Sequence, residues 1–253
     1  MTNDKLVSII IPVYNAASYL EETINSIQEQ TYSNWEAIFI DDCSSDNSYN
    51  LIKKHQKEDK RIKLIKNKTN SGAAVSRNNG INHAEGDYIC FLDADDKWHP
   101  KKIEKQLKFM KKLNCEFSFT GYQFADKKCN PNGKIVSVPD KINYQQTLKN
   151  TTIWTSTVMF DMEKLSKEDI YMPNVARGQD TATWWKVLKK IDCAYGLNEV
   201  LSYYRRSEGT LSSNKFIALK RTWNLYRNVE HLNIFYSMYC FFWYCVNAIK
   251  RRI

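Results

Sequence analysis

The sequence predicts an α/β fold built on a mainly parallel β-sheet that is flanked by helices. Short apolar runs rich in Ile, Val and aromatic residues alternate with helical stretches over the first 120 residues. This alternation is typical of strand–helix–strand units with right-handed crossovers. Polar or acidic residues follow three of the apolar runs, and ligands of parallel sheets bind at the carboxyl ends of the strands.

Four apolar runs predict strands that are covered on both faces, because their apolar residues are continuous rather than alternating. These runs are residues 6–11, 35–40, 62–65 and 88–92. Helices are expected between and after them, at residues 18–30, 45–56, 72–84 and 100–113. Ser18 and Glu21 resemble a capping box that opens the first helix, and Gly86 is expected to stop the third.

The second half has a looser pattern. It predicts strands at residues 116–126, 134–138 and 153–160, and a helix at residues 178–190. No internal repeat or low-complexity linker interrupts the chain. We therefore expect one domain, 1–213, with halves 1–113 and 114–213, followed by a basic, aromatic helical tail, 214–253.

Composition indicates a folded chain of 253 residues, with 43% hydrophobic and 26% charged residues. Its seven cysteines include no C-x-x-C pair, which favours reduced thiols in a cytoplasmic protein. The N-terminal apolar run is read as a first strand, since it lacks the pattern of a secretory signal. The formal net charge is +9, and the tail contains seven Lys or Arg and one Glu.

Asp93 and Asp95 follow the strand at 88–92 in a D-x-D pattern. Two carboxylates with this spacing can both reach one hard cation, which would hold a diphosphate. The alternative is a turn or helix cap that uses Asp96 ahead of Pro100. An EF-hand is excluded because Trp98 stands where that loop requires Gly, and neither a P-loop nor G-x-G-x-x-G occurs.

Several motifs occur together with the D-x-D. They are P-x-Y-N at 12–15, D-D-x-S-x-D at 41–46 and R-N-x-G-I at 77–81. In this order the motifs strongly resemble the nucleotide-sugar-binding half of glycosyltransferase family 2 enzymes, which have the GT-A fold. The resemblance is dense across residues 7–113, and it implies a nucleotide-sugar donor and a divalent cation, Mn²⁺ or Mg²⁺.

The resemblance also implies roles for individual residues. Pro12 and Tyr14 would wall the nucleotide base, and Asp42 would bond the base edge, whereas Asp41 is expected to be structural. Arg77 would lie near the diphosphate or base. Asp93 would lie near the ribose and the metal, and Asp95 would be the principal metal ligand.

In this family an acid at the start of a helix in the second half takes the proton of the acceptor hydroxyl. The matching residue is Asp180, with Gln179 where Glu is frequent. The alternative for Asp180 is a helix N-terminal acid stabilised by the helix dipole. Trp184 and Trp185 are expected to pack the helix, with one of them as an alternative wall of the acceptor site.

Residues 203–215 resemble a flexible family segment, although the His that it often carries is absent. Arg205 and Arg206 are expected in an exposed basic loop; the alternative is contact with the diphosphate. Residues 231–253 form a helical apolar stripe that ends in Lys250, Arg251 and Arg252, and the uninterrupted apolar part is shorter than a membrane span needs.

An interfacial helix on the inner membrane surface is one interpretation of this stripe, and packing on the domain or a homodimer is the other. No nucleic-acid motif accompanies the basic tail, so nucleic acid is not an expected partner. The resemblance implies an inverting, metal-dependent glycosyltransferase that moves a sugar, with a UDP-sugar as the expected donor, to a hydroxyl of a growing bacterial surface glycan or lipid-linked glycan. The alternatives are a nucleotidyltransferase and a non-catalytic protein that binds the membrane surface.

Overall fold

The computed structural model describes residues 5–150, 152–205 and 215–250. Within them the strands form one ten-stranded sheet in the order β3-β2-β1-β4-β9-β6-β10-β5, with β7 beside β6 and β8 beside β10. The strands are β1 (Val7–Val13), β2 (Trp35–Asp41), β3 (Ile62–Lys66), β4 (Tyr88–Phe91), β5 (Lys97–Trp98), β6 (Phe117–Ala125), β7 (Pro131–Val136), β8 (Lys141–Ile142), β9 (Met159–Asp161) and β10 (Ala194–Arg205).

The four strands predicted in the first half are parallel: β1 pairs with β2 and β4, and β2 pairs with β3. The short β5, which the sequence did not predict, pairs antiparallel with β10. The second half is mixed. There β9 runs antiparallel to both β4 and β6, whereas β6 and β10 are parallel. The expected division at residue 113 falls at the end of α4, and the sheet continues across it.

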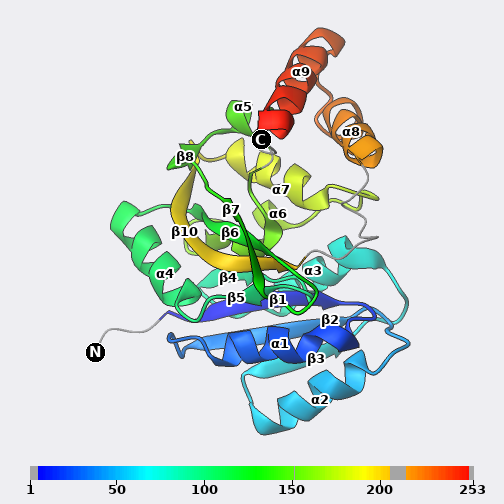
Figure 1. The fold of residues 1–253 in the computed structure, drawn as a ribbon, viewed down its shortest axis with the longest axis vertical. Helices are drawn as coiled ribbons and strands as arrows, with labels where there is room; N and C mark the ends of the chain where they lie inside the picture. Colours follow the sequence, from blue (N-terminus) through cyan, green and yellow to red (C-terminus); the bar gives the residue numbers. More distant parts are fainter. Residues whose placement is uncertain (1–4, 151, 206–214, 251–253) are drawn as a thin grey trace.

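Helices cover both faces of the sheet. They are α1 (Ala17–Gln28), α2 (Ser48–Glu58), α3 (Gly72–His83), α4 (Lys102–Leu113), α5 (Tyr144–Thr147), α6 (Lys167–Ile170), α7 (Gln179–Leu188), α8 (Lys215–Asn224) and α9 (Ile234–Lys250), with a 3₁₀ turn η1 (Thr155–Thr157) and a π-helical turn η2 (Leu225–Val229). In Figure 1, α1 and α2 lie below β1, and α3 and α7 lie above it.

The continuous apolar runs of the strands are explained by two hydrophobic clusters, one on each face. Ile9 packs in the cluster beneath α1, α2 and α4, and its neighbour Ile10 packs in the cluster beneath α3 and α7. Successive side chains of a strand point to opposite faces, so a strand that is covered twice must be apolar throughout.

Three sequence predictions about local structure are corrected. Ser18 does not cap α1; the N–H groups of Ala16 and Ala17 instead donate to Oγ of Ser48 (2.9 Å) and Oδ2 of Asp46 (3.0 Å). Asp46 lies in the loop after β2 and Ser48 is the first residue of α2, both about 30 residues further along the sequence. Only the fold brings them to the start of α1.

The other two corrections concern Gly86 and residues 153–160. Gly86 lies two residues beyond the C-cap of α3 and packs against β1, where an added Cβ would be 2.7 Å from N of Ser8. Residues 153–160 form η1 and only the start of β9. The hydroxyl of Thr157 donates to the carbonyl of Trp154 (2.6 Å), which favours the turn over a strand.

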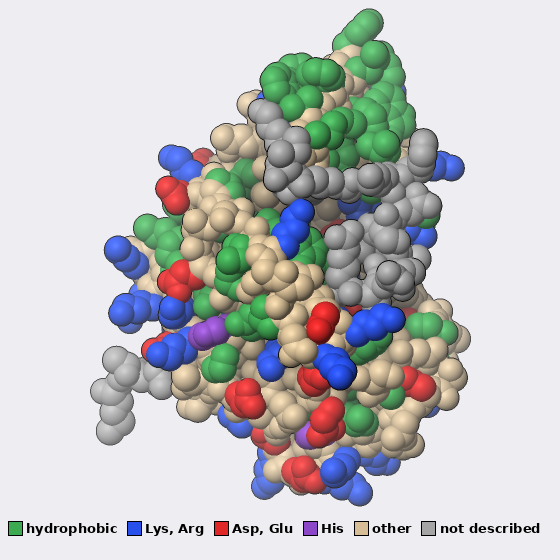
Figure 2. All heavy atoms as spheres, in the orientation of Figure 1, with side chains coloured by type: hydrophobic (Ala, Val, Ile, Leu, Met, Phe, Trp, Pro, Cys, Tyr) green, Lys and Arg blue, Asp and Glu red, His purple; other side chains and the backbone are tan. Residues whose placement is uncertain are grey.

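The tail forms α8, η2 and α9 at one end of the molecule (Figure 1). One side of it packs on the domain, where Tyr226 stacks on Trp185 of α7 with ring centroids 5.5 Å apart. The other side of α9 is exposed and apolar, with Phe235 at 82% exposure, and Figure 2 shows the hydrophobic side chains gathered there. In the described part of the chain, no helix has both the length and the apolar character that crossing a bilayer requires.

Candidate active site

The carboxyl ends of β1, β2 and β4 open onto a cavity of about 500 Å³. Its lining includes the six residues that the sequence assigned to the donor and the metal, namely Pro12, Tyr14, Asp42, Arg77, Asp93 and Asp95. The Tyr14 side chain is 55% exposed and leaves an aromatic surface at the wall. The predicted convergence of the three strand ends is thus observed.

Asn15 joins the first two motifs. Its side-chain Oδ1 accepts hydrogen bonds from the backbone N–H of Ser45 (2.8 Å) and Asp46 (3.4 Å), and its own N–H donates to Oγ of Ser44 (3.1 Å). Asn15 has φ of +49°, a left-handed conformation that Asn tolerates better than most residues. The loop after β2 therefore fixes the turn that presents Tyr14.

Asp42 orders the loop that leads into α3. Its Oδ2 accepts from N–H of Gly72 (2.7 Å), and its Oδ1 accepts from N–H of Ser71 (2.9 Å) and from the Asn67 side chain (2.7 Å). Gly72 has φ of +85°, where residues other than glycine are strained. Asp42 thereby connects the end of β2 to the start of the helix that carries Arg77.

Arg77 reaches the cavity because α3 lies very close to the sheet. An added Cβ on Gly80 would lie 2.5 Å from Cγ2 of Ile10, so this position of the R-N-x-G-I motif requires glycine for close packing. The Arg77 side chain is buried, and its Nη2 donates to Oδ1 of Asp93 at 2.5 Å. Arg77 thus places a fixed positive charge at the base of the cavity beside one carboxylate of the D-x-D.

Asp95 lies in a site that favours a bound cation. Burial, followed by the neighbouring charge of Asp93, raises its pKa to about 6. A divalent cation would relieve this repulsion, and carboxylate oxygens are the ligands that Mn²⁺ and Mg²⁺ prefer. Across residues 5–150, 152–205 and 215–250, no group of three or more His, Cys, Asp or Glu could hold a metal. A cation at Asp93 and Asp95 would therefore need oxygen ligands from a phosphate or water.

Asp96 does more than shape a turn. Its N–H bonds the carbonyl of Asp93 (3.0 Å), as a turn requires, but its side chain is buried. Oδ2 accepts from the hydroxyl of Ser156 (2.5 Å) and from Nε1 of Trp154 (3.1 Å). Burial raises the pKa of this carboxyl well above its usual range. Asp96 thus anchors the D-x-D loop to η1.

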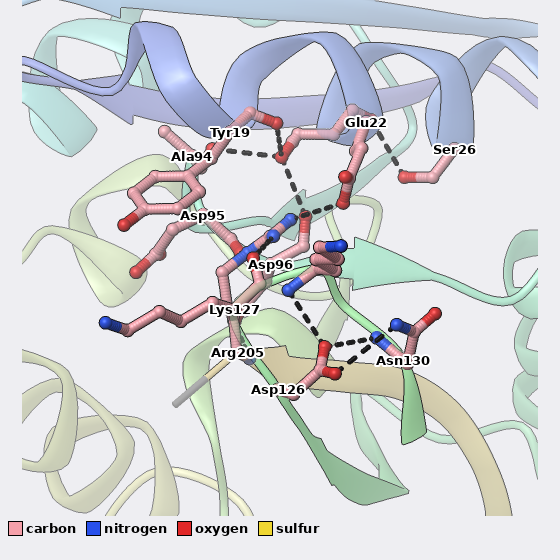
Figure 3. A network of polar contacts seen from close by, with 12 residues as sticks. Tyr19, Glu22, Ser26, Ala94, Asp95, Asp96, Asp126, Lys127, Asn130 and Arg205 are labelled. Carbon is pink, nitrogen blue, oxygen red and sulfur yellow. Dashed lines mark hydrogen bonds and ion pairs between the residues drawn. The ribbon is translucent and has the colours of Figure 1, made fainter. Parts of the chain in front are cut away.

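Arg205 corrects the prediction of an exposed basic loop, because its side chain is only 3% exposed. Figure 3 shows its guanidinium at the centre of a polar network. Nε donates to the carbonyl of Asp95 (2.7 Å), Nη2 to Glu22 (2.7 Å) and Nη1 to the carbonyl of Lys127. Its position at the end of the apolar run of β10 is the signal that could have identified it. Arg206 lies outside the described residues.

Asp180 lies in the first turn of α7, after Gly178, whose φ is +81°. Its Oδ2 accepts a hydrogen bond from the hydroxyl of Thr155 (3.2 Å), and its Oδ1 accepts from N–H of Thr181 (2.7 Å). Asp180 is not part of the cavity lining, yet η1 connects it to the D-x-D loop: Thr155 bonds Asp180, and the next residue, Ser156, bonds Asp96.

Trp184 and Trp185 pack α7, as predicted, and are 2% and 1% exposed. The alternative that one of them lines the acceptor site is therefore wrong. Trp154, which the sequence did not single out, is half-buried, donates a hydrogen bond to Asp96 and immediately precedes Thr155, which bonds Asp180.

Residues 8–171 match the family model described as "Glycosyl transferase family 2". A putative teichuronic acid biosynthesis glycosyltransferase of Bacillus subtilis, TuaG, is 45% identical over the whole of both chains. An Escherichia coli glucosyltransferase, WfgD, named for transfer from UDP-Glc to α-D-GlcNAc-diphosphoundecaprenol, is 38% identical over 88% of this chain and 86% of its own.

Solved structures share the fold at lower identity. S. aureus TarS in complex with UDP-GlcNAc superimposes with a TM-score of 0.70 at 20% identity, over 88% of this chain and 66% of that chain. A Pyrobaculum calidifontis mannosyltransferase in complex with GDP-Man and Mn²⁺ gives 0.65 at 18% identity, over 88% and 63%. The family match and the full-length relative agree with the motifs and the sheet, and they favour glycosyl transfer over the nucleotidyltransferase and non-catalytic alternatives. The chain belongs to glycosyl transferase family 2.

Proposed function

We propose that this protein transfers one sugar from a nucleotide diphosphate donor, UDP-linked by preference, to a hydroxyl of a lipid-linked surface glycan, with inversion at the anomeric carbon. The observation that carries this proposal is the connection of two acidic centres through adjacent residues. Thr155 holds Asp180, and Ser156 holds the loop of Asp93 and Asp95. Domain 1–213 would supply the whole site, with the donor in its first half and the acceptor in its second.

The donor would occupy the cavity. Tyr14 and Pro12 offer the apolar wall for a base, and Asp42 offers a carboxylate at its edge. Arg77 supplies a buried positive charge for the diphosphate. Asp93 would contact both the ribose and the metal. The hydrogen bond that its Oδ1 accepts from Arg77 holds the carboxylate in place.

Asp95, with Asp93, would hold a divalent cation, Mn²⁺ or Mg²⁺. When bound, such a cation neutralises the charge that develops on a departing diphosphate. The complexes of structural neighbours with UDP-GlcNAc, and with GDP-Man and Mn²⁺, support this assignment by analogy. The bonds of Arg205 to the carbonyl of Asp95 and of Ser156 to Asp96 hold the loop, and they would keep both carboxylates in position for the cation.

Asp180 would act as the general base of a single displacement. Its carboxylate would accept the proton of the acceptor hydroxyl while the oxygen forms a bond to the anomeric carbon and the bond to the diphosphate breaks. The hydrogen bond from Thr155 orients one oxygen, and the N–H of Thr181 orients the other. No covalent sugar intermediate forms, because the chain's acid acts on the acceptor rather than on the donor.

The acceptor would be presented at a membrane surface. The name of the E. coli relative contains a diphosphoundecaprenol acceptor, which supports a lipid-linked glycan here. The exposed side of α9 carries Phe235, Met238 and Phe242, an apolar row that could enter the lipid boundary from the cytoplasmic side. Self-association of two chains through this row is the alternative, and it would show as a dimer on size-exclusion chromatography without binding to vesicles.

A screen of nucleotide sugars tests the function. The full chain is incubated with UDP-, GDP- and dTDP-sugars and short-chain lipid diphosphate acceptors, with Mn²⁺, Mg²⁺ or a chelator. We expect nucleotide release that needs both acceptor and cation, and an inverted anomeric configuration in the product by NMR. Release of pyrophosphate from a nucleoside triphosphate, or turnover undiminished by the chelator, would contradict the proposal.

A further inference from the structure

Four aromatic side chains cluster on the second half of the sheet, outside the cavity. Tyr122 and Phe124 are two residues apart on β6 and so point to the same face. Tyr204 of β10 lies beside Phe124 in the parallel register. Trp154, just before η1, completes the cluster, with its ring centroid 4.2 Å from that of Tyr204 at an interplanar angle of 42°.

The cluster has a buried base and a partly exposed surface. Tyr122 is 8% exposed and contacts the other three rings, with centroids 5.8 to 6.5 Å away. Phe124, Trp154 and Tyr204 are half-buried. Packing alone would explain Tyr122. The other three rings are partly exposed, and Tyr204 contacts both Phe124 and Trp154, so together they offer a contact area for an apolar ligand face.

Hydrogen bonds of Trp154 and of residues adjacent to the cluster connect this surface to both acidic centres. Trp154 donates Nε1–H to Asp96 (3.1 Å), and the residue that follows it, Thr155, donates to Asp180 (3.2 Å). Tyr204 immediately precedes Arg205, which donates to the carbonyl of Asp95. The aromatic surface therefore lies between the strand end that fixes the D-x-D and the turn that holds the proposed base.

We propose that Phe124, Trp154 and Tyr204 form an acceptor subsite that binds a pyranose ring of the acceptor glycan by stacking. The inference rests on the function proposed above. A pyranose has a face of C–H groups and a rim of hydroxyls. It therefore matches aromatic rings bordered by polar groups, and stacking would direct one hydroxyl of the rim toward Asp180.

The other candidate occupants fit less well. The nucleobase has its own wall at Pro12 and Tyr14, in a cavity whose lining contains none of the three rings. An acyl chain would not need the hydrogen-bonding groups of Thr155 and Asp180 beside it. A sugar uses both kinds of surface at once.

The matched variants are Tyr204→Leu, which removes the ring, and Tyr204→Phe, which keeps it. Phe124→Leu provides a second removal on the neighbouring strand. Tyr49→Leu is the control for loss of a half-buried aromatic residue elsewhere, since Tyr49 lies on α2 at the far side of the first half. Thermal unfolding of each variant establishes that it is folded before binding is measured.

Saturation-transfer NMR measures the subsite without turnover. The full chain, with UDP and Mn²⁺, is mixed with the methyl glycosides of glucose, galactose, N-acetylglucosamine and N-acetylgalactosamine. We expect saturation of the C–H protons on one face of at least one glycoside. The effect should fall three- to tenfold in Tyr204→Leu and Phe124→Leu and persist in Tyr204→Phe and Tyr49→Leu.

Equal saturation in wild type and in both folded Leu variants, or no saturation of any glycoside, would overturn the subsite. Donor affinity should stay within about twofold in Tyr204→Leu, because a parallel loss would place the donor on these rings instead. Failure of the wild type to release nucleotide from any donor would refute the proposed function alone, since glycoside binding is read independently.

Discussion

The hydroxyl of Thr155 donates to Oδ2 of Asp180 at 3.2 Å, while the adjacent Ser156 donates to Asp96. One turn of 3₁₀ helix thus holds the start of α7 and the D-x-D loop in a fixed relation. The proposed base and the proposed metal ligands come from segments about 85 residues apart in the sequence. Their relative position depends on η1, which neither motif contains.

Asp180→Asn should abolish transfer while leaving donor binding intact. The amide keeps the size of the side chain but cannot accept the proton, so the rate should fall about 10²- to 10⁴-fold. Nucleotide release and donor titration calorimetry measure the two effects. Thr155→Val is the companion variant: it leaves the carboxylate but removes its orienting bond, and a loss of several-fold is expected. An Asn variant with full activity would refute the role of Asp180.

Asp95→Ala should remove the dependence of donor binding on the cation. The wild type should gain thermal stability from UDP with Mn²⁺ beyond that from UDP alone, because a ligand of the folded state raises its melting temperature. The variant should lose this increment. Asp192→Ala removes an exposed carboxylate in the loop after α7 and serves as the control. An undiminished increment in Asp95→Ala would exclude Asp95 as the principal ligand.

Arg205→Lys should weaken cation binding although it preserves the charge. Lysine lacks the planar fork that bonds Asp95, Glu22 and Lys127 together, so the D-x-D loop loses a backbone anchor. We expect the Mn²⁺ concentration needed for half-maximal activity to rise about tenfold, with kcat at saturating Mn²⁺ falling less. If kcat falls and the Mn²⁺ requirement does not change, Arg205 has a different role.

Phe235 and Phe242 should carry membrane contact. Changing both to Ser should reduce co-sedimentation with vesicles of phosphatidylglycerol and phosphatidylcholine by at least tenfold, since each ring contributes roughly 1.5 to 3 kcal/mol of burial. Turnover of a short-chain, water-soluble acceptor should not change. If the wild type instead elutes as a dimer and the variant as a monomer, with no vesicle binding, the apolar row of α9 is a dimer surface.

Asp59 should make a pH-dependent contribution to stability. Its hydrogen bonds with Arg61 are the main reason that its pKa is lowered to about 2. An unfolded Asp has a pKa near 3.9, so the contribution is fully present above about pH 4 and is lost as the pH falls toward 2. Asp59→Asn should therefore lower the free energy of unfolding by about 1 kcal/mol at pH 7. The difference from wild type should shrink at pH 3, as urea unfolding at both pH values would measure.

The sequence by itself determined the four parallel strands of the first half and the sheet edge at which three of them end. Continuous apolar runs require strands that are covered on both faces, and parallel strands must end at one edge, so Tyr14, Asp42 and Asp93 had to converge. Those inferences need only the chain order and the side-chain period. The sequence also predicted the apolar stripe of the tail. It did not predict which side of the tail packs on the domain and which side is exposed.

Only the tertiary structure decided the contacts between segments distant in the sequence. Asp46 caps α1 in place of Ser18, Arg205 is buried against Asp95 rather than exposed, and Trp154 joins Tyr204 beside the turn that holds Asp180. A polar or aromatic side chain in an irregular segment can satisfy its bonds with many partners. Which partner it meets depends on how the strands of the second half are ordered in the sheet, and no local pattern of residues encodes that order.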